Sequence, residues 1–211
     1  GAGGNCGDIG GWIIDGEVHY MDVLRYLFGD VERVYAETRN FEPTRYLDTQ
    51  NLQRPVPSDV EDTAICVLTF KNGVIGRFVW THAAIGKEIH QRIYYGSEGS
   101  IDSSGIQCKN GSTRSMNELS EQFLNTLSHD DKEKLFPHGI TNAVALGIYD
   151  FLDAVRNNRE PEVTGWDGFA AQAICDAIYE SAYCGQAVSV DDVICSKIEA
   201  YQADINAHWG F

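Results

Sequence analysis

The sequence predicts an α+β fold in which a mostly antiparallel, open β-sheet carries helices on one face. In the middle of the chain, segments rich in β-branched and aromatic residues follow one another through short turns, which makes consecutive strands antiparallel neighbours. Toward both ends, apolar residues recur at helical spacing instead. Helices before and after such a sheet are expected to cover one of its faces. The other face must then be covered by something else. We expect residues 1–211 to form a single domain.

The first part of the chain is predicted to run from a helix into a strand. Residues 14–28 have helical spacing, and Gly29 with Asp30 supplies a stop signal. Residues 31–41 alternate like a strand. Residues 42–58 contain three of the chain's five prolines, which predicts an irregular excursion, either a mobile lid or an arm that contacts a partner.

A hairpin and a short meander follow this excursion. Residues 60–70 and 74–84 are predicted strands, and Asn72 with Gly73 between them is a strong turn signal. Residues 90–95 and 100–101 continue the meander through a turn at residues 96–99.

The last part of the chain is predicted to be helical. One helix ends at residues 157–161, a second covers residues 167–184 and closes at Gly185, and a third covers residues 191–208. The first of these is predicted from apolar residues at helical spacing: Ile140, Val144, Ile148, Phe151, Leu152 and Val155.

Composition excludes several classes of function. The net charge of −15 is spread along the chain and repels polyanions, so we expect no nucleic-acid partner. No apolar run reaches the roughly 20 residues that span a bilayer, so we expect no membrane partner and a cytoplasmic location. The six cysteines lack the paired spacing of a zinc site, which predicts free thiols and no metal site.

The predicted first helix carries a candidate proton-transfer group. Asp15, His19, Asp22 and Tyr26 are spaced i, i+4, i+7 and i+11 and therefore share one stripe. That stripe lies opposite the three residues expected to reach the core: Tyr20, Leu24 and Leu27. A histidine between two carboxylates suits a general base near neutral pH. The alternative is a surface histidine in an ordinary pair with Asp15 or Asp22.

Aromatic side chains elsewhere are candidates for substrate support. A sugar or cyclitol ring can rest on an aromatic face. The candidates are Trp12, His82 and Trp166, and Trp80 could offer a similar surface. The alternative for each is packing in the core or at an interface.

Four segments, in order along nearly the whole chain, resemble the glucose-fructose oxidoreductase and inositol dehydrogenase (Gfo/Idh/MocA) family. Residues 10–22, GGWIIDGEVHYMD, resemble its GGG-x-L-x-D-x-G-x-H-x-x-D segment, although Glu17 and Val18 replace the usual Gly-Ile. Residues 60–64, VEDTA, with the FKNG of residues 70–73, resemble its hairpin. Residues 95–101, YGSEGSI, resemble its G-x-x-G-x-I turn, and residues 150–182 match its C-terminal helices.

The resemblance implies a fold like the C-terminal domain of this family, which is related to that of glyceraldehyde-3-phosphate dehydrogenase. It implies a separate N-terminal Rossmann domain that holds NAD or NADP, and we expect that domain to be absent from this chain. The glycine-rich residues 1–11 follow no predicted strand, so they are not expected to bind phosphate. The family's Glu-Lys-Pro motif is also missing from the sequence, so we expect the isolated chain to be inactive.

At the matching positions, the resemblance implies that His19 is the proton-transferring base and Asp15 positions the substrate hydroxyl, with Asp22 in support. The implied activity is a dehydrogenase acting on a secondary hydroxyl of a sugar, a sugar derivative or a cyclitol. Two alternatives stay open: glycoside cleavage or elimination through transient oxidation, and a non-catalytic binding or dimerisation module.

The predicted sheet also implies self-association. In residues 74–84, both the even-numbered and the odd-numbered positions include apolar side chains, so both faces of the strand are apolar. Helices cover only one face, and we expect the other to pair with a second copy, as in family members that dimerise through this sheet.

Overall fold

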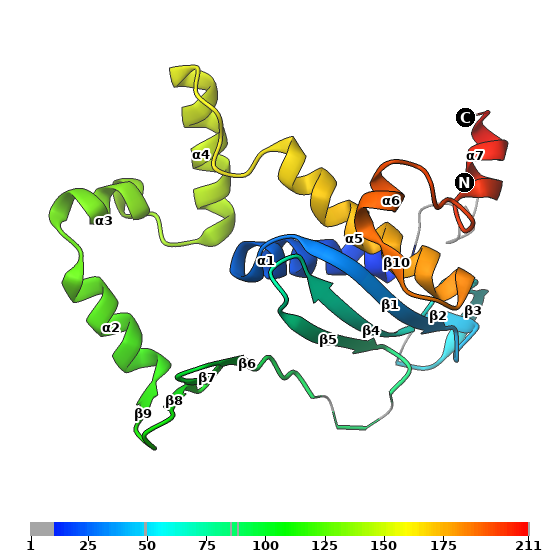
Figure 1. Cartoon of the computed structure of the whole chain (residues 1–211), viewed down its shortest axis with the longest axis horizontal. Helices are drawn as coiled ribbons and strands as arrows, with labels where there is room; N and C mark the ends of the chain where they lie inside the picture. The colour runs from blue at the N-terminus through cyan, green and yellow to red at the C-terminus, as the bar shows by residue number, and fades with distance from the viewer. Residues whose placement is uncertain (1–10, 49, 85, 88, 211) are drawn as a thin grey trace. The chain divides into compact units, whose positions relative to one another are not determined.

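A computed structural model describes residues 11–48, 50–84, 86–87 and 89–210 (Figure 1). The chain forms two compact units: a main unit of residues 1–84 and 163–211, and an inserted unit of residues 85–162. The glycine-rich residues 1–10 lie outside the described part.

The main unit is built on one antiparallel sheet with the strand order β10-β1-β4-β5. These strands are β1 (Val31–Arg39), β4 (Thr63–Phe70), β5 (Ile75–Thr81) and β10 (Val188–Ser189). The β4–β5 connection is the predicted turn, where Gly73 has φ of 88° and the Asn72 side chain accepts the Val74 N–H at 3.1 Å. The predicted strands and the α+β class are therefore confirmed.

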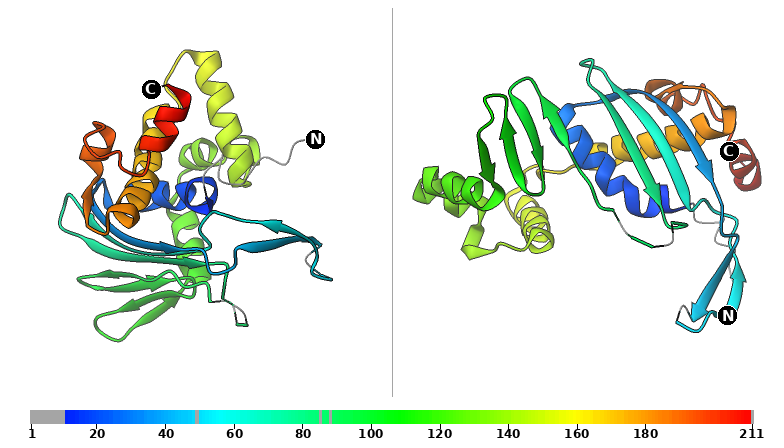
Figure 2. Two further views of the ribbon diagram at one scale, coloured as in Figure 1. Left: turned by 90° about the vertical axis from the view of Figure 1, so that its right-hand side faces the viewer. Right: turned by 90° about the horizontal axis from the view of Figure 1, so that it is seen from below.

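Helices α1 (Val18–Phe28) and α5 (Gly165–Cys184) cover one face of this sheet (Figure 2). Alternation along β4 shows why: Ala64, Cys66, Leu68 and Phe70 are buried toward the helices, and Ile65 and Val67 between them are exposed. Helix α5 begins with a capping box of Thr164 and Asp167 and ends at the left-handed Gly185, as predicted.

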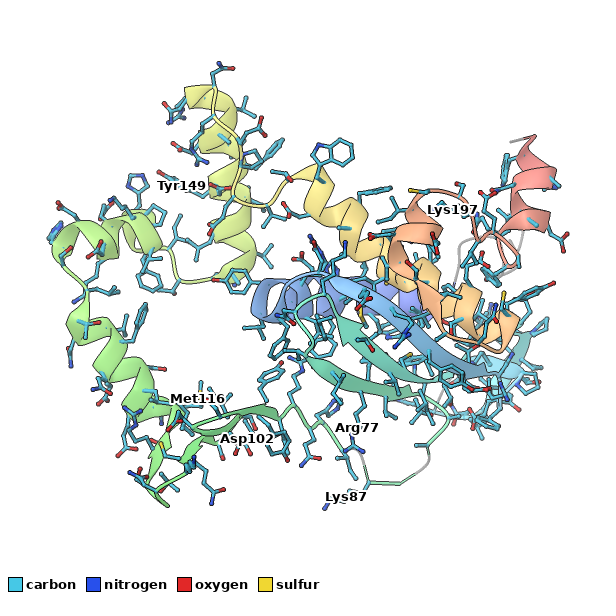
Figure 3. The ribbon with its side chains drawn as sticks, viewed as in Figure 1. Arg77, Lys87, Asp102, Met116, Tyr149 and Lys197 are labelled. Carbon is cyan, nitrogen blue, oxygen red and sulfur yellow. The ribbon has the colours of Figure 1, made fainter. Side chains whose placement is uncertain are left out.

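The opposite face of the sheet is open and apolar. It carries five exposed large side chains: Tyr35, Ile65, Val67, Ile75 and Val79. Cross-strand pairing places Ile65 opposite Val79 and Tyr35 opposite Val67. Arg77 lies on the same face and points away from the helices (Figure 3).

The prediction of irregular structure at residues 42–58 is wrong. This segment forms a hairpin of β2 (Thr44–Asp48) and β3 (Gln53–Pro57) that projects from the sheet (Figure 2). Pro57 pairs with Thr44 and Pro55 with Tyr46. Proline has no N–H to donate, and it is tolerated here because β3 is an edge strand of this two-stranded sheet.

Asp62 fixes the base of that hairpin. Its carboxylate is fully buried, and one oxygen accepts the N–H groups of Phe41 and Glu42 at 2.9 and 2.7 Å. The Arg45 guanidinium lies 3.5 Å from the same oxygen. The carboxylate therefore satisfies backbone donors at the point where the chain leaves β1.

The predicted continuous helix over residues 191–208 is also wrong. The segment contains α6 (Val190–Ile194) and α7 (Ala203–Trp209), separated by a non-helical stretch in which Ser196 has φ of 53°. The buried Glu180 of α5 explains the break, because its carboxylate accepts the N–H groups of Tyr201 and Gln202 and ties this stretch to α5.

The inserted unit begins with a sheet of its own, ordered β6-β7-β8-β9. Its strands are β6 (Tyr94–Gly96), β7 (Gly99–Asp102), β8 (Gly105–Cys108) and β9 (Thr113–Ser115). The predicted meander is confirmed in β6 and β7, although the first strand, predicted at residues 90–95, begins only at Tyr94. Strands β8 and β9 were not predicted.

The rest of the inserted unit is helical. Helix α4 (Ala143–Asn157) confirms the prediction from apolar spacing. Helices α2 (Met116–Thr126) and α3 (His129–Leu135), and the 3-10 turn Pro137–Gly139, were not predicted. The two unpredicted helices begin with capping boxes at Ser115 and Ser128, a signal that the sequence does carry. None of the helices in the described residues is long and apolar enough to cross a membrane.

Candidate active site

A π-helical turn precedes α1 and carries the first candidate residue. Residues Ile13–Glu17 form this turn, and His19 lies in the first turn of α1. A π-turn is wider than an α-turn. The predicted i, i+4 stripe assumed an α-helix from residue 15 onward, and this assumption fails for Asp15. Single π-turns in helices are often found at functional sites.

Asp15 and His19 are both exposed, and neither side chain makes a hydrogen bond or ion pair with another residue in the described part of the chain. The ordinary surface pair that was the alternative reading of His19 is therefore not formed there. Asp22 does not pair with His19 either, because its carboxylate lies 3.9 Å from the guanidinium of Arg25. Arg25 in turn bonds Asp30 at 3.1 Å, so these charges hold the far end of α1.

The buried side of α1 differs in part from the prediction. Leu24 is buried as expected, and so is Met21, but Leu27 is 46% exposed. Met21, Leu24 and Phe28 follow helical spacing toward the sheet, where the Phe28 ring meets Phe70 at 5.6 Å. Leu27 lies at the edge of this buried stripe of α1 and stays partly exposed.

Three aromatic side chains gather beside the π-turn, and we call them the aromatic cluster: Trp12, Trp80 and His82. The rings of Trp12 and Trp80 are stacked, with centroids 6.0 Å apart, and the His82 ring lies 4.9 Å from Trp12 and 4.7 Å from Trp80. Trp12 is 39% exposed and His82 is exposed. Trp166 is not part of the cluster, because its ring contacts Phe169 on α5.

Glycine at position 16 makes room for this cluster. A Cβ added at Gly16 would lie 2.5 Å from the Trp12 indole, which rests over this residue. The indole N–H of Trp12 donates to Glu17 at 3.1 Å. The glycine between Asp15 and His19 thus lets the Trp12 indole pack directly against the π-turn.

The sequence did not single out Glu61 and Tyr179 as site residues. One carboxylate oxygen of Glu61 accepts the backbone N–H of Ile13 at 3.0 Å and the Tyr179 hydroxyl at 2.8 Å. Burial, together with the Glu61 carboxylate, raises the pKa of Tyr179, which keeps this hydroxyl a donor. Glu61 lies in the VEDTA segment and Tyr179 in residues 150–182, both of which resemble the family, and that position was the available signal.

Two of the cysteines lie in the core of the main unit. Burial raises the pKa of Cys66 and of Cys175 to about 12, so neither is a thiolate near neutral pH. The described part of the chain holds no group of three His, Cys, Asp or Glu side chains placed to bind a metal ion.

The C-terminal alpha/beta domain model of the Gfo/Idh/MocA oxidoreductase family matches residues 5–190. The chain belongs to this family. The resemblance read from the four sequence segments is therefore confirmed.

Among curated relatives, 1,5-anhydro-D-fructose reductase of Ensifer adhaerens is 24% identical over 188 residues, which is 86% of this chain and 48% of that protein. The uncharacterised oxidoreductase YrbE of Bacillus subtilis is 24% identical over 183 residues, 86% of this chain and 49% of its own length. This chain spans about half the length of both relatives.

The same fold occurs in a levoglucosan dehydrogenase solved in complex with NADH and L-sorbose. That structure is 23% identical with a TM-score of 0.65, over 87% of this chain and 52% of the dehydrogenase.

Proposed function

We propose that this chain, both units together, is the substrate-binding and oligomerisation domain of an NAD(P)-dependent oxidoreductase. It acts on a secondary hydroxyl of a sugar, a sugar derivative or a cyclitol. The observation that carries the proposal is the π-turn: Asp15 in this turn and His19 just after it are exposed, beside the aromatic cluster, and their side chains have no polar partner among the described residues.

The chemistry assigns a separate task to each residue. Oxidising an alcohol moves a hydride from carbon to the nicotinamide, while the hydroxyl proton passes to a base. His19 accepts that proton, because a neutral imidazole is a base near neutral pH. Asp15 accepts a hydrogen bond from a substrate hydroxyl and holds it toward His19, and Asp22 supports the helix through Arg25.

Trp12 and His82 support the substrate ring. The C–H face of a sugar or cyclitol packs against an indole, and Trp12 offers such a face above Gly16. Trp166 lies outside the cluster, with its ring against Phe169, so it is not assigned to this ring contact. A polyhydroxylated substrate agrees with the names of a relative, 1,5-anhydro-D-fructose reductase, and of a protein with the same fold, levoglucosan dehydrogenase.

Nucleotide binding is assigned to the family's N-terminal domain, since the chain spans about half the length of its relatives. The described residues contain no glycine loop between a strand and a helix that would receive the phosphates of NAD. We therefore expect no heat of binding when NAD+ or NADP+ is titrated into the 211-residue chain alone. Micromolar affinity in this calorimetric titration would contradict the assignment.

The open sheet face is the proposed contact with a second copy. Its exposed apolar side chains favour burial, and a lysine on each of two facing strands would oppose it. We expect sedimentation of the wild-type chain to show a dimer or a larger assembly at tens of micromolar, and Ile65→Lys with Val79→Lys to give a monomer.

Val23→Lys is the matched control, since Val23 is exposed on α1 rather than on the sheet. It should leave the assembly unchanged. A monomeric wild-type chain under the same conditions contradicts the proposal.

The activity itself is tested on the full-length protein by following the reduced nicotinamide spectroscopically. The test mixtures combine NAD+ or NADP+ with levoglucosan, myo-inositol or a hexose. Net reduction with any of them supports the proposal. Substrate consumption without net reduction would instead indicate redox-neutral chemistry at the same site.

A further inference from the structure

We propose that Glu61 and Tyr179 are positioning residues that set the π-turn from which Asp15 and His19 are presented. This inference rests on the proposed function for its catalytic meaning. Its structural content, an anchor for residues 13–17, is tested separately.

The anchor begins at the first residue of the π-turn. The first N–H groups of a helix have no partner inside the helix and need one from elsewhere. Trp12, the residue before the turn, offers no side-chain cap. Glu61, which immediately precedes the buried Asp62 in the chain, accepts the Ile13 N–H instead, at 3.0 Å. The turn is therefore tied, from its first residue, to the segment that leads into β4.

Tyr179 holds the Glu61 carboxylate in place. Its hydroxyl donates to the same oxygen at 2.8 Å, and its ring is stacked on Tyr201, with centroids 4.9 Å apart and an interplanar angle of 11°. Tyr179 itself is buried on α5. The two hydrogen bonds thus link α5, the segment before β4 and the π-turn through one carboxylate oxygen of Glu61.

Close packing adds a steric constraint to these hydrogen bonds. A Cβ at Gly11 would overlap the Glu61 carboxylate. Only glycine, which has no side chain, therefore lets the backbone come this close to the carboxylate. Ile13 is fully buried, which fixes the side of the turn that faces the core. Asp15, two residues later, is exposed. The Ile13 N–H is bonded to Glu61 and its side chain is buried in the core. The anchor therefore sets the direction in which Asp15 points.

The test is backbone hydrogen exchange in the full-length protein, with histidine ring signals followed by NMR. Tyr179→Phe keeps the stacked ring and removes the hydroxyl. We expect exchange in residues 13–17 to accelerate about fivefold, as for the loss of one hydrogen bond, and the His19 ring signals to shift. Glu61→Ala should show a larger change, and Glu61→Gln, which keeps an acceptor oxygen, should recover most of the protection.

Tyr201→Phe is the matched control. It removes a hydroxyl from the other ring of the same stack, and the structure gives that hydroxyl no hydrogen bond to a described residue. It should leave residues 13–17 unchanged. Equal acceleration in residues 13–17 and in β1 and β4 after Tyr179→Phe would overturn the proposal, because the tyrosine would then support the whole unit. Unchanged exchange and unchanged His19 signals would overturn it as well.

These readouts need no substrate, so they separate the anchor from the base. If the π-turn loosens in Tyr179→Phe but a His19 variant keeps normal turnover, the anchor stands and the assignment of the base fails.

Discussion

Replacing His19 by alanine in the full-length enzyme is expected to lower turnover by about 10² to 10⁴, the range for a positioned proton acceptor. Cofactor affinity should not change, because His19 is assigned to the substrate and not to the nucleotide. Steady-state kinetics together with calorimetric titration of NAD+ measure the two effects separately.

Two further variants on the same helix test the division of roles. Asp15→Asn should also lower turnover, because an amide accepts from a substrate hydroxyl less strongly than a carboxylate does. Asp22→Asn is the control. It removes a carboxylate whose only contact in the described residues is the 3.9 Å approach to Arg25, so we expect a smaller loss. If all three variants only shift stability by about 0.5 kcal/mol and leave rates alone, the group is a surface charge cluster.

Replacing Asp62 by alanine is expected to lower the free energy of unfolding by about 3 kcal/mol, since buried donors would lose their acceptor. The N–H groups of Phe41 and Glu42 depend on this carboxylate, and Arg45 is paired with it. Asp62→Asn keeps one oxygen for the two N–H groups and should lose less. Chemical denaturation gives the values.

The pH dependence of this loss provides an internal check. Burial acts to raise the pKa of Asp62, but the hydrogen bonds from Glu42, Phe41 and Thr63 and the charge of Arg45 outweigh it and lower the pKa. A lowered pKa in the folded state means that the charged carboxylate stabilises the fold at neutral pH, and this contribution is lost as the pH falls through the folded pKa. The gap between wild type and Asp62→Ala should therefore narrow in acid.

Asp59→Ala is the matched control, because Asp59 is exposed near the same hairpin base. We expect a change within about 0.5 kcal/mol. A similar loss in both variants would mean that Asp62 has no special place in the fold.

The strands and the central helices were predictable because local patterns and tertiary structure agree. Alternation along residues 63–70 and the Asn72-Gly73 turn determine β4 and β5 without help from distant residues. The two wrong predictions were decided by distant partners. Asp62 supports a hairpin at residues whose prolines suggested irregular structure, and Glu180 breaks a helix through contacts 21 and 22 residues away.

The candidates Asp15 and His19 could be proposed from the sequence, but the geometry around them could not. Spacing and the family motif single out Asp15 and His19, but the π-turn depends on Glu61 and Tyr179, which are 48 and 166 residues from Ile13 in the chain. The Trp12–Trp80 stack likewise needs the register of β5 against β4. Such long-range contacts leave no periodicity in the sequence.

The most direct test of the central claim, that His19 is the base, is a crystal structure of the full-length protein with nicotinamide nucleotide and a polyol substrate. The quantity to measure is the distance between a ring nitrogen of His19 and the hydroxyl oxygen on the carbon that faces the nicotinamide. We predict about 2.6 to 3.2 Å, with Asp15 contacting the substrate from the same helix. A reacting hydroxyl that meets a different side chain, with His19 left in solvent, would contradict the account.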